Sequence, residues 1–198
     1  MSINNLPQPI DRIFRDDNLF HKVSDISALF DELMIAMVDL LECDRCHIYI
    51  RDPELSIGQT LHCHCNSIDI PDIIDSKPYC EPIYFAEKDP LFAAALQCER
   101  SIFLDDLTSV SPQKGDLNFF AQHYKGQKSL VQGHICSDNQ LWGIFQASQF
   151  GRSRPWTRFD YNMVSTVIDK ITPLVSVYVK RKLRHTIQEL NDGKYCHY

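Results

Sequence analysis

Hydrophobic residues recur at helical spacing in the first regular segment of the chain, residues 24–41. The apolar side chains follow the spacing i, i+3, i+4 and i+7, and they are Ile26, Leu29, Phe30, Leu33, Met34, Met37, Val38 and Leu41. This period places them on one face of an amphipathic helix. Ser24 is the expected N-cap, because its hydroxyl can accept a free backbone N–H of the first turn.

The hydrophobic period changes to two in residues 45–52, where apolar and polar side chains alternate as they do in a strand. Turn residues that include Pro53 and Gly58 follow, and residues 59–66 then alternate in the same way. We expect these two runs to form a hairpin. Residues 68–90 contain four prolines and predict a long irregular crossover.

Shorter elements follow the crossover. Residues 91–98 predict an Ala-rich helix opened by Asp89-Pro90, residues 101–104 a brief strand, and residues 117–124 another short helix. A second hairpin is expected from residues 129–136 and 141–150. The last helix is expected over residues 158–190, with Pro173 kinking or interrupting it because proline supplies no N–H.

This order of elements predicts one α+β domain built on an antiparallel sheet of five or six strands. We expect the terminal helices on one face of the sheet and the short mid-chain helices on the other. A length of 198 residues leaves little room for a second core. We divide the chain into an N-terminal arm (1–23), the domain (24–179) and a C-terminal helical tail (180–198), in which Leu183, Ile187 and Leu190 are spaced for a short interhelical seam.

Four short motifs give the chain a resemblance to GAF domains, in particular those of cyanobacterial photoreceptors. They are Cys43-Asp44-Arg45, Asp105-Asp106, Gln140-Leu141-Trp142-Gly143 and Arg154-x-Trp156. The resemblance covers roughly residues 24–179 and gives the sheet and helices the same expected architecture. It implies a pocket for a small molecule or chromophore between the sheet and the mid-chain helices, and a homodimer formed through the terminal helices.

The side chains expected around that pocket come from two short helices and one strand. They are Phe92, Leu96, Phe119, Phe120, His123, Phe145 and Ser148. An apolar cavity with a few polar groups is the usual form of a ligand site. Aromatic residues at helical spacing also build plain core, so a filled pocket without a ligand remains the alternative.

Two features of the bilin-binding members are missing from this chain. Those members attach their chromophore through a cysteine in the segment that corresponds to residues 109–115, where this chain has neither cysteine nor histidine. They also carry a histidine on the strand after the Leu-Trp-Gly motif, where this chain has Ala147-Ser148-Gln149. We therefore expect no covalent bilin, unless Cys80 or Cys98 attaches one from elsewhere, and the sequence identifies no other cofactor.

Charge and composition exclude several classes of function. A net charge of -6 and a pI near 5.7 argue against nucleic acid and anionic membranes as partners, which clustered Lys and Arg would bind. No apolar run approaches the ~20 residues that span a bilayer, and residues 1–9 lack the features of a signal peptide. We therefore expect a cytoplasmic protein whose eight cysteines are thiols, core residues or metal ligands.

Cysteines and histidines cluster in residues 43–47 and 62–65. A register that pairs Cys46 with Cys65 and His47 with His64 would put the strand cysteines on one face and the histidines on the other. The candidate ligands of a zinc site are then Cys43, Cys46, Cys63 and Cys65. We favour the competing interpretation, in which the cysteines are core residues and the histidines form a polar lining or a surface under a helix.

No nucleophile elbow, phosphate loop or paired-carboxylate motif is present in the sequence. We predict a non-enzymatic regulatory or sensory module that acts through dimerisation and an unidentified protein partner, with or without a small molecule in its pocket. The alternatives are a cofactor sensor that holds bilin, haem or a metal through Cys and His, and a thiol-dependent reductase.

Overall fold

The computed structural model describes residues 7–14, 23–109 and 122–191. The helices are α1 (Gln8–Ile13), α2 (Val23–Leu40), α3 (Phe85–Lys88), α4 (Pro90–Leu96), α6 (Arg158–Tyr178) and α7 (Arg184–Asn191), with a 3₁₀ turn η1 (Leu107–Ser109) and a π-helical turn η2 (Val179–Leu183). The strands are β1 (Arg45–Asp52), β2 (Ile57–Cys65), β3 (Tyr79–Cys80), β4 (Ile102–Leu104), β5 (Gln127–Ser137) and β6 (Gln140–Phe150).

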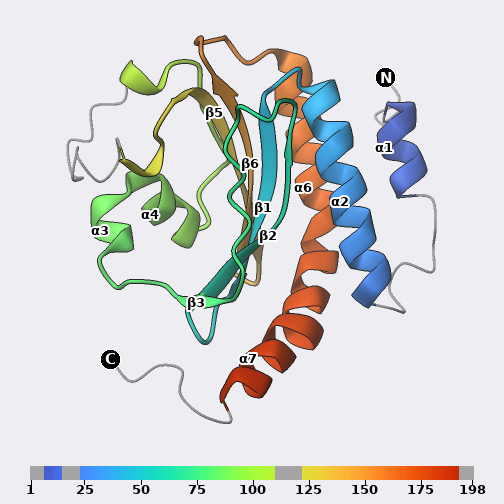
Figure 1. Ribbon diagram of the computed structural model, residues 1–198, viewed down its shortest axis with the longest axis vertical. Helices are drawn as coiled ribbons and strands as arrows, with labels where there is room; N and C mark the ends of the chain where they lie inside the picture. Colours follow the sequence, from blue (N-terminus) through green and yellow to red (C-terminus); the bar gives the residue numbers. More distant parts are fainter. Residues whose placement is uncertain (1–6, 15–22, 110–121, 192–198) are drawn as a thin grey trace.

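The strands form one antiparallel sheet in the order β3-β2-β1-β6-β5-β4. Its two long hairpins, β1–β2 and β5–β6, meet where β1 pairs with β6. Figure 1 shows α2 and α6 against one face of this sheet and α3 and α4 over the other. The α+β architecture predicted from the sequence is therefore confirmed.

The main core lies between the sheet and the two long helices. The stripe of α2 predicted from the periodicity is buried, and on α6 Val164, Val167, Ile171 and Val175 are fully buried. Each such side chain contributes about 1.5–3 kcal/mol relative to an exposed one. Gly133 of β5 lets α6 approach the sheet, since a Cβ there would lie 2.9 Å from Cδ1 of Ile168.

The core continues beyond residues 24–179 at both ends. Ile10 of α1 is completely buried against it, and Leu183 and Ile187 are 1% and 4% exposed. The structure thus places these two residues of the expected seam inside the protein's own core, and the Leu190 side chain lies outside what the structure describes. Helix α6 runs through Pro173, and its α-helical pattern changes at η2, so the helix is not interrupted at the proline; the alternative expectation, a kink there, stays a prediction.

The register of the β1–β2 hairpin differs from the predicted one. Cys46 pairs with His64, and Ile48 with His62, but Tyr49 pairs with Thr60, which leaves Leu61 as an extra residue in a β-bulge. The predicted pairing of Cys46 with Cys65 was therefore wrong. Because one extra residue moves every later side chain to the opposite face, Cys63 and Cys65 do not share a face with Cys46.

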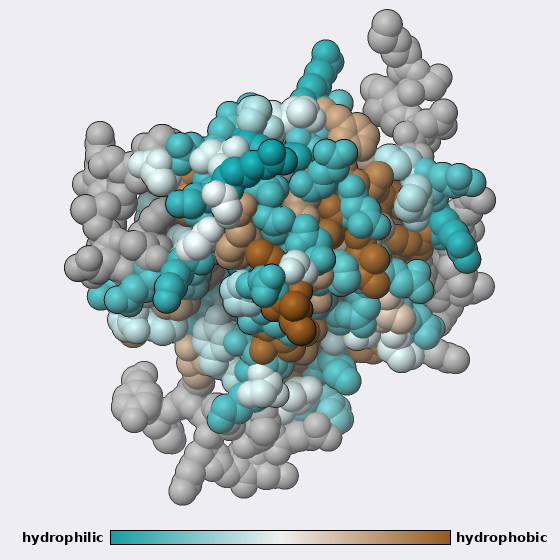
Figure 2. All heavy atoms as spheres, turned by 45° about the horizontal axis from the view of Figure 1, so that its top comes forward, coloured by the Kyte–Doolittle hydropathy of each residue, from teal (hydrophilic) through white to brown (hydrophobic). Residues whose placement is uncertain are grey.

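The surface is largely hydrophilic on the face shown in Figure 2, with apolar residues in limited groups. The large apolar side chains that are most exposed are Ile35, Leu55, Ile68, Ile74, Ile83, Tyr84, Phe159 and Tyr161. None of the helices within residues 7–14, 23–109 and 122–191 combines the length and the apolar character that crossing a membrane requires.

Candidate functional site

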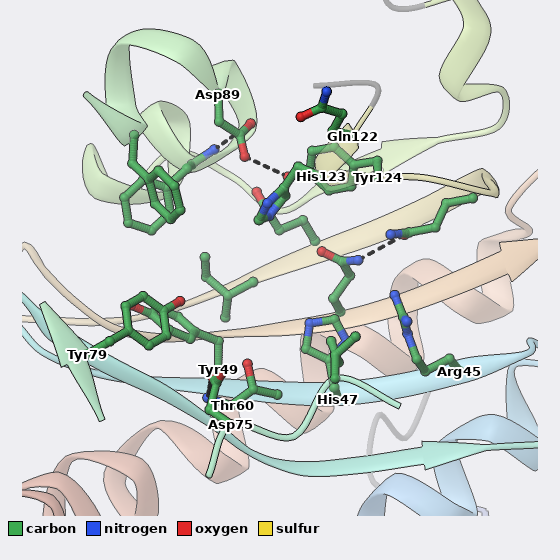
Figure 3. Close-up of a pocket in the computed structure, with 17 residues that line it drawn as sticks. Arg45, His47, Tyr49, Thr60, Asp75, Tyr79, Asp89, Gln122, His123 and Tyr124 are labelled. Atoms are coloured by element: carbon green, nitrogen blue, oxygen red, sulfur yellow. Dashed lines mark hydrogen bonds between the residues drawn. The ribbon is translucent and has the colours of Figure 1, made fainter. Parts of the chain in front are cut away.

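A cavity of about 390 Å³ lies on the face of the sheet that α2 and α6 leave free. Figure 3 shows its floor of strand residues beneath a roof from α3, α4 and the residues just before β5. The lining residues are Arg45, His47, Tyr49, Thr60, Ile73, Asp75, Tyr79, Phe85, Asp89, Phe92, Gln122, His123, Tyr124, Gln127, Gln132, Ile144 and Gln146. Polar and aromatic side chains therefore predominate around it.

The alternation of side chains along β1 and β6 decides which of their residues form the cavity floor. On β1, Arg45, His47 and Tyr49 line the cavity, whereas Cys46 and Ile48 between them belong to the helix-side core. On β6, Ile144 and Gln146 line it in the same way, and the intervening Phe145 is completely buried on the other face. The period of two that identifies these strands thus also divides core residues from cavity residues.

Asp89 fixes the roof at the start of α4. Its Oδ1 accepts hydrogen bonds from the backbone N–H groups of Leu91 (2.9 Å) and Phe92 (3.3 Å), and its Oδ2 accepts one from the Tyr124 hydroxyl at 2.9 Å. Burial raises the pKa of Asp89, and the hydrogen bond from Tyr124 opposes that shift. The carboxylate therefore caps the helix and ties it to the residues before β5.

A second carboxylate fixes the aromatic wall. The Tyr49 hydroxyl donates to Oε1 of Glu81 at 2.6 Å, and Nε of Arg51 donates to both carboxylate oxygens at 2.8 and 2.9 Å. Gly58 is required beneath the tyrosine, because a Cβ there would lie 1.7 Å from the Tyr49 hydroxyl. Tyr49 is consequently held in one position at the cavity wall.

Arg45 and His47 are the least satisfied polar residues of the floor. Arg45 is 3% exposed; its Nη1 donates to the Pro71 carbonyl at 2.8 Å, and its guanidinium lies 5.0 Å from the Phe150 ring centroid, but its Nε has no hydrogen-bond partner among the described residues. His47 is 7% exposed, and its Nδ1 also lacks a hydrogen-bond partner in the part of the chain that the structure describes. Burial, with the neighbouring Arg45 charge, lowers the pKa of His47 to about 3, so the imidazole is neutral at physiological pH.

Amide side chains complete the floor. Nε2 of Gln146 donates to Oε1 of Gln127 at 3.0 Å and to the Ser148 hydroxyl at 3.1 Å. The Ser148 hydroxyl in turn donates to Oε1 of Gln127 at 2.7 Å. Ser148 therefore supports two residues of the lining from beneath and is itself completely buried.

The residues expected around a pocket fall in different places. Phe92 and His123 line the cavity, Ser148 lies under its floor, and Leu96 packs beside it against the cluster that contains Phe92. Phe145 lies on the opposite face of the sheet. Phe119 and Phe120 lie outside the described residues.

Sequence reasoning missed Arg45, Tyr49 and the glutamines as members of the site. The signal for Arg45, His47 and Tyr49 was present, since they alternate in sequence with the apolar residues of β1. It was not decisive, because every residue of β1 is buried and the polar face of the strand is covered by the roof. A polar face under a roof and a polar face in water have the same sequence pattern.

The four candidate zinc ligands do not come together. Cys43 and Cys46 lie in the helix-side core with their sulfurs 3.4 Å apart, and both are nearly inaccessible. Cys63 and Cys65 pair with His47 and Arg45 across the hairpin, on the other face. Across residues 7–14, 23–109 and 122–191, no group of three or more His, Cys, Asp and Glu side chains has a geometry that could hold a metal ion.

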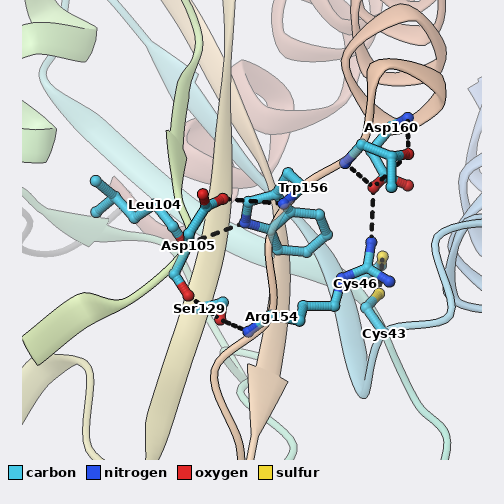
Figure 4. A network of polar contacts seen from close by, with 9 residues as sticks. Cys43, Cys46, Leu104, Asp105, Ser129, Arg154, Trp156 and Asp160 are labelled. Carbon is cyan, nitrogen blue, oxygen red and sulfur yellow. Dashed lines mark hydrogen bonds and ion pairs between the residues drawn. The ribbon is translucent and has the colours of Figure 1, made fainter.

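The Asp105 and Arg154-x-Trp156 motifs meet at a corner of the sheet (Figure 4). Oδ1 of Asp105 accepts from the Trp156 N–H at 2.9 Å, and the indole Nε1 donates to the Leu104 carbonyl at 3.0 Å. Arg154 lies over the Trp156 ring and donates to Asp160, which forms a capping box with Thr157 at the start of α6. These motifs therefore join β4 to α6 and lie away from the cavity lining.

Comparison with known proteins relates this chain to one protein family and to several solved structures. The model of the GAF domain family matches residues 25–172. The chain matches no curated protein sequence. Among solved structures, it is similar to the phycoerythrobilin-bound GAF domain from a cyanobacterial phytochrome, with a TM-score of 0.66 and 14% identity over 90% of this chain and 98% of that one.

Two further structures are similar at the level of the fold. The blue-light-absorbing form of the Thermosynechococcus elongatus PixJ GAF domain has a TM-score of 0.59 and 20% identity over 87% of this chain and 96% of that one. The GAF domain from an Acinetobacter phosphoenolpyruvate-protein phosphotransferase has a TM-score of 0.59 and 9% identity over 87% and 95%.

Proposed function

Because the chain belongs to the GAF domain family, we propose that it is a regulatory or sensory module that binds a small molecule in the cavity beneath α3 and α4. The observation that carries this proposal is a pair of buried nitrogens on the cavity floor, Nε of Arg45 and Nδ1 of His47, that have no partner within residues 7–14, 23–109 and 122–191. Leaving such groups unpaired costs free energy that a bound ligand would offset. The cavity volume of about 390 Å³ lies in the usual range for small-molecule sites.

A non-enzymatic role is part of this proposal. A catalytic thiol needs a depressed pKa, but burial raises the pKa of Cys63 and of Cys136 to about 12 and also raises the pKa of Cys46. Asp89, the buried carboxylate of the roof, is occupied by three hydrogen bonds. These contacts support a binding role for the cavity.

Bilin-binding GAF domains are similar to this chain in fold, and a non-covalent chromophore would be one kind of small molecule. The Ser148 hydroxyl is hydrogen-bonded to Gln127 and Gln146, two residues of the cavity lining. We propose that the protein is colourless as purified. An absorption spectrum with metal analysis tests this, and a visible band or a stoichiometric metal would favour the cofactor-sensor alternative.

Signalling would require a partner, and we propose a homodimer formed through the exposed faces of the terminal helices. Ile35 of α2 is 48% exposed, and Phe159 and Tyr161 of α6 are 48% and 45% exposed. Light scattering on the purified protein measures the mass and tests this; a monomer at all concentrations would contradict it. An unidentified protein partner and a cytoplasmic location remain predictions from the sequence.

The binding proposal is tested by screening metabolite mixtures for stabilisation of the wild-type protein in thermal unfolding. Ile144→Phe replaces an aliphatic side chain of the cavity lining with a bulkier phenyl ring. This variant is expected to abolish stabilisation by any compound found. Ile83→Phe makes the same change at a side chain that is 92% exposed, outside the lining, and should leave it intact. The proposal fails if no compound stabilises the wild type, or if both variants respond as it does.

A further inference from the structure

The Arg45 guanidinium is a buried cation that forms no ion pair among the described residues, although the charge of Asp72 acts on it from a longer distance. Its partner among the described residues is a neutral one, the Pro71 carbonyl, which takes Nη1. No carboxylate in that part of the chain lies within ion-pair distance of it. A charge that is 97% buried is ordinarily paired, because desolvation is costly.

The part of the Arg45 guanidinium that is not bound to Pro71 is one of its planar edges. With Nη1 bound to Pro71, the edge formed by Nε and Nη2 has no hydrogen-bond partner in the described structure. This edge is the fork whose two parallel N–H groups match the two oxygens of a carboxylate. The unpartnered Nδ1 of His47 lies on the same floor, two residues along β1.

The remaining charges of the cavity orient a ligand. Figure 3 shows Arg45 at one end, while Asp75 lies at the other, near Tyr49 and Thr60, and Asp89 lies in the roof. Oδ2 of Asp75 accepts from the Thr60 N–H at 2.7 Å, so both carboxylates are held by backbone groups, and neither forms an ion pair with Arg45. An acidic group of a ligand would therefore be attracted to the Arg45 end and repelled from the other.

The end away from Arg45 is aromatic. Tyr49 and Tyr79 lie together there in Figure 3, with ring centroids 6.3 Å apart, and Phe85 and Phe92 pack edge-to-face in the roof with centroids 5.8 Å apart. Ring systems bind favourably to such faces and edges. The ligand that fits both ends has a flat apolar body and one acidic head.

Building on the proposed small-molecule function, we propose that the cavity binds a small aromatic carboxylate, with its carboxylate on the Nε–Nη2 edge of Arg45 and its ring among Tyr49, Tyr79, Phe85 and Phe92. One guanidinium next to a neutral imidazole balances one negative charge. This favours a carboxylate over a phosphate, which carries more charge near Asp75 and Asp89.

The test compares 2-naphthoate with 2-naphthamide, its neutral analogue of nearly the same shape, by calorimetry on the wild-type protein. A charge-assisted fork is expected to make the acid bind at least about tenfold more tightly. Equal binding of the two, tighter binding of the amide, or tighter binding of 2-naphthyl phosphate would overturn the carboxylate assignment while leaving the cavity a binding site.

Substitutions test whether the preference for the acid over the amide depends on Arg45. Arg45→Gln should remove the preference for the acid, and Arg45→Lys should recover only part of it, because lysine keeps the charge but not the fork. Arg100→Gln removes an exposed arginine outside the lining and should keep the full preference. Binding of the acid that persists in Ile144→Phe would place the probe outside the cavity, and no binding of any probe to the wild type would overturn the inference without deciding the metabolite screen.

Discussion

His47 shows at the scale of one residue how the cavity floor depends on pH. Its pKa in the folded protein is about 3, below the ordinary 6.5, so the unfolded chain takes up the proton first as pH falls. Stability contributed by the neutral imidazole is complete above pH 6.5 and is lost as pH falls toward 3. The slope for one proton is at most about 1.4 kcal/mol per pH unit.

We predict that His47→Gln flattens this dependence. Between pH 6.5 and 4, urea unfolding of the wild type should show a steeper loss of free energy of unfolding than that of the variant, because glutamine cannot be protonated. Other buried groups titrate in both proteins and cancel in the difference. Parallel curves would show that His47 is not buried in its neutral form.

Gly143 of the Leu-Trp-Gly motif has a packing role that the motif alone does not reveal. A Cβ there would lie 2.5 Å from the Tyr49 carbonyl oxygen, a backbone atom of the neighbouring strand. We predict that Gly143→Ala lowers the free energy of unfolding by about 2–3 kcal/mol or prevents folding, because β1 and β6 would have to separate.

Gly133→Ala is the matched comparison, since its new methyl would meet the movable side-chain ends of Ile168 and Val164. Its cost should be smaller in the same urea titration. A reversed order would mean that the backbone of β1 moves more easily than the α6 side chains.

At this scale the sequence predicted part of the site. Phe92 and His123 were expected at the pocket from the two mid-chain helices, and both line the cavity. Phe145 was expected at the pocket as a contribution of the strand, but the face of β6 that meets the roof is set by its pairing with β1 and cannot be read from the strand by itself. The free edge of Arg45 depends on where Pro71 lies, which no local pattern encodes.

At the scale of elements, periodicity predicted α2, the two hairpins and α6, because each buries one face against the same core. The β-bulge at Leu61 was missed for a physical reason. An extra residue between two alternating runs leaves both runs intact in the sequence, and only their pairing reveals it. The one extra residue, Leu61, therefore determines on which face of the sheet the Cys63 and Cys65 side chains lie.

Arg184 joins helix α7 to the β1–β2 hairpin through an ion pair with a buried carboxylate. The Arg184 guanidinium donates to both oxygens of Asp52, whose side chain is completely buried, and to Glu54 at 2.9 Å. We predict that Arg184→Ala costs about 1–3 kcal/mol, between exposed and buried pairs, because Arg184 is 30% exposed.

Hydrogen exchange measures which part of the structure loses stability in Arg184→Ala. The amides of α7 should exchange faster in Arg184→Ala, whereas Lys182→Ala, which removes an exposed charge from the preceding turn, should leave them protected. Equal exchange in the two variants would mean that apolar packing of Leu183 and Ile187 alone holds the helix.

For the whole molecule, the core is larger than the segment that matches the GAF family. Ile10 belongs to it although α1 lies before residue 25, so the division of the chain into arm and domain does not follow the packing. We predict that Ile10→Ala lowers the free energy of unfolding by about 2–4 kcal/mol. Ile68→Ala, at a fully exposed side chain, should change it by less than about 0.5 kcal/mol in the same urea titration. Equal costs would mean that α1 detaches readily.

The strand order also governs when this fold can form. β1 is central in the sheet, yet its second neighbour is β6, made about a hundred residues later. During synthesis, the first hairpin therefore waits with an open backbone edge until residue 150 has emerged, and such edges invite pairing between chains. We predict that the slow, aggregation-sensitive step of folding is the docking of the two hairpins where β1 pairs with β6, and that chaperone dependence is greatest for chains stalled before these strands pair.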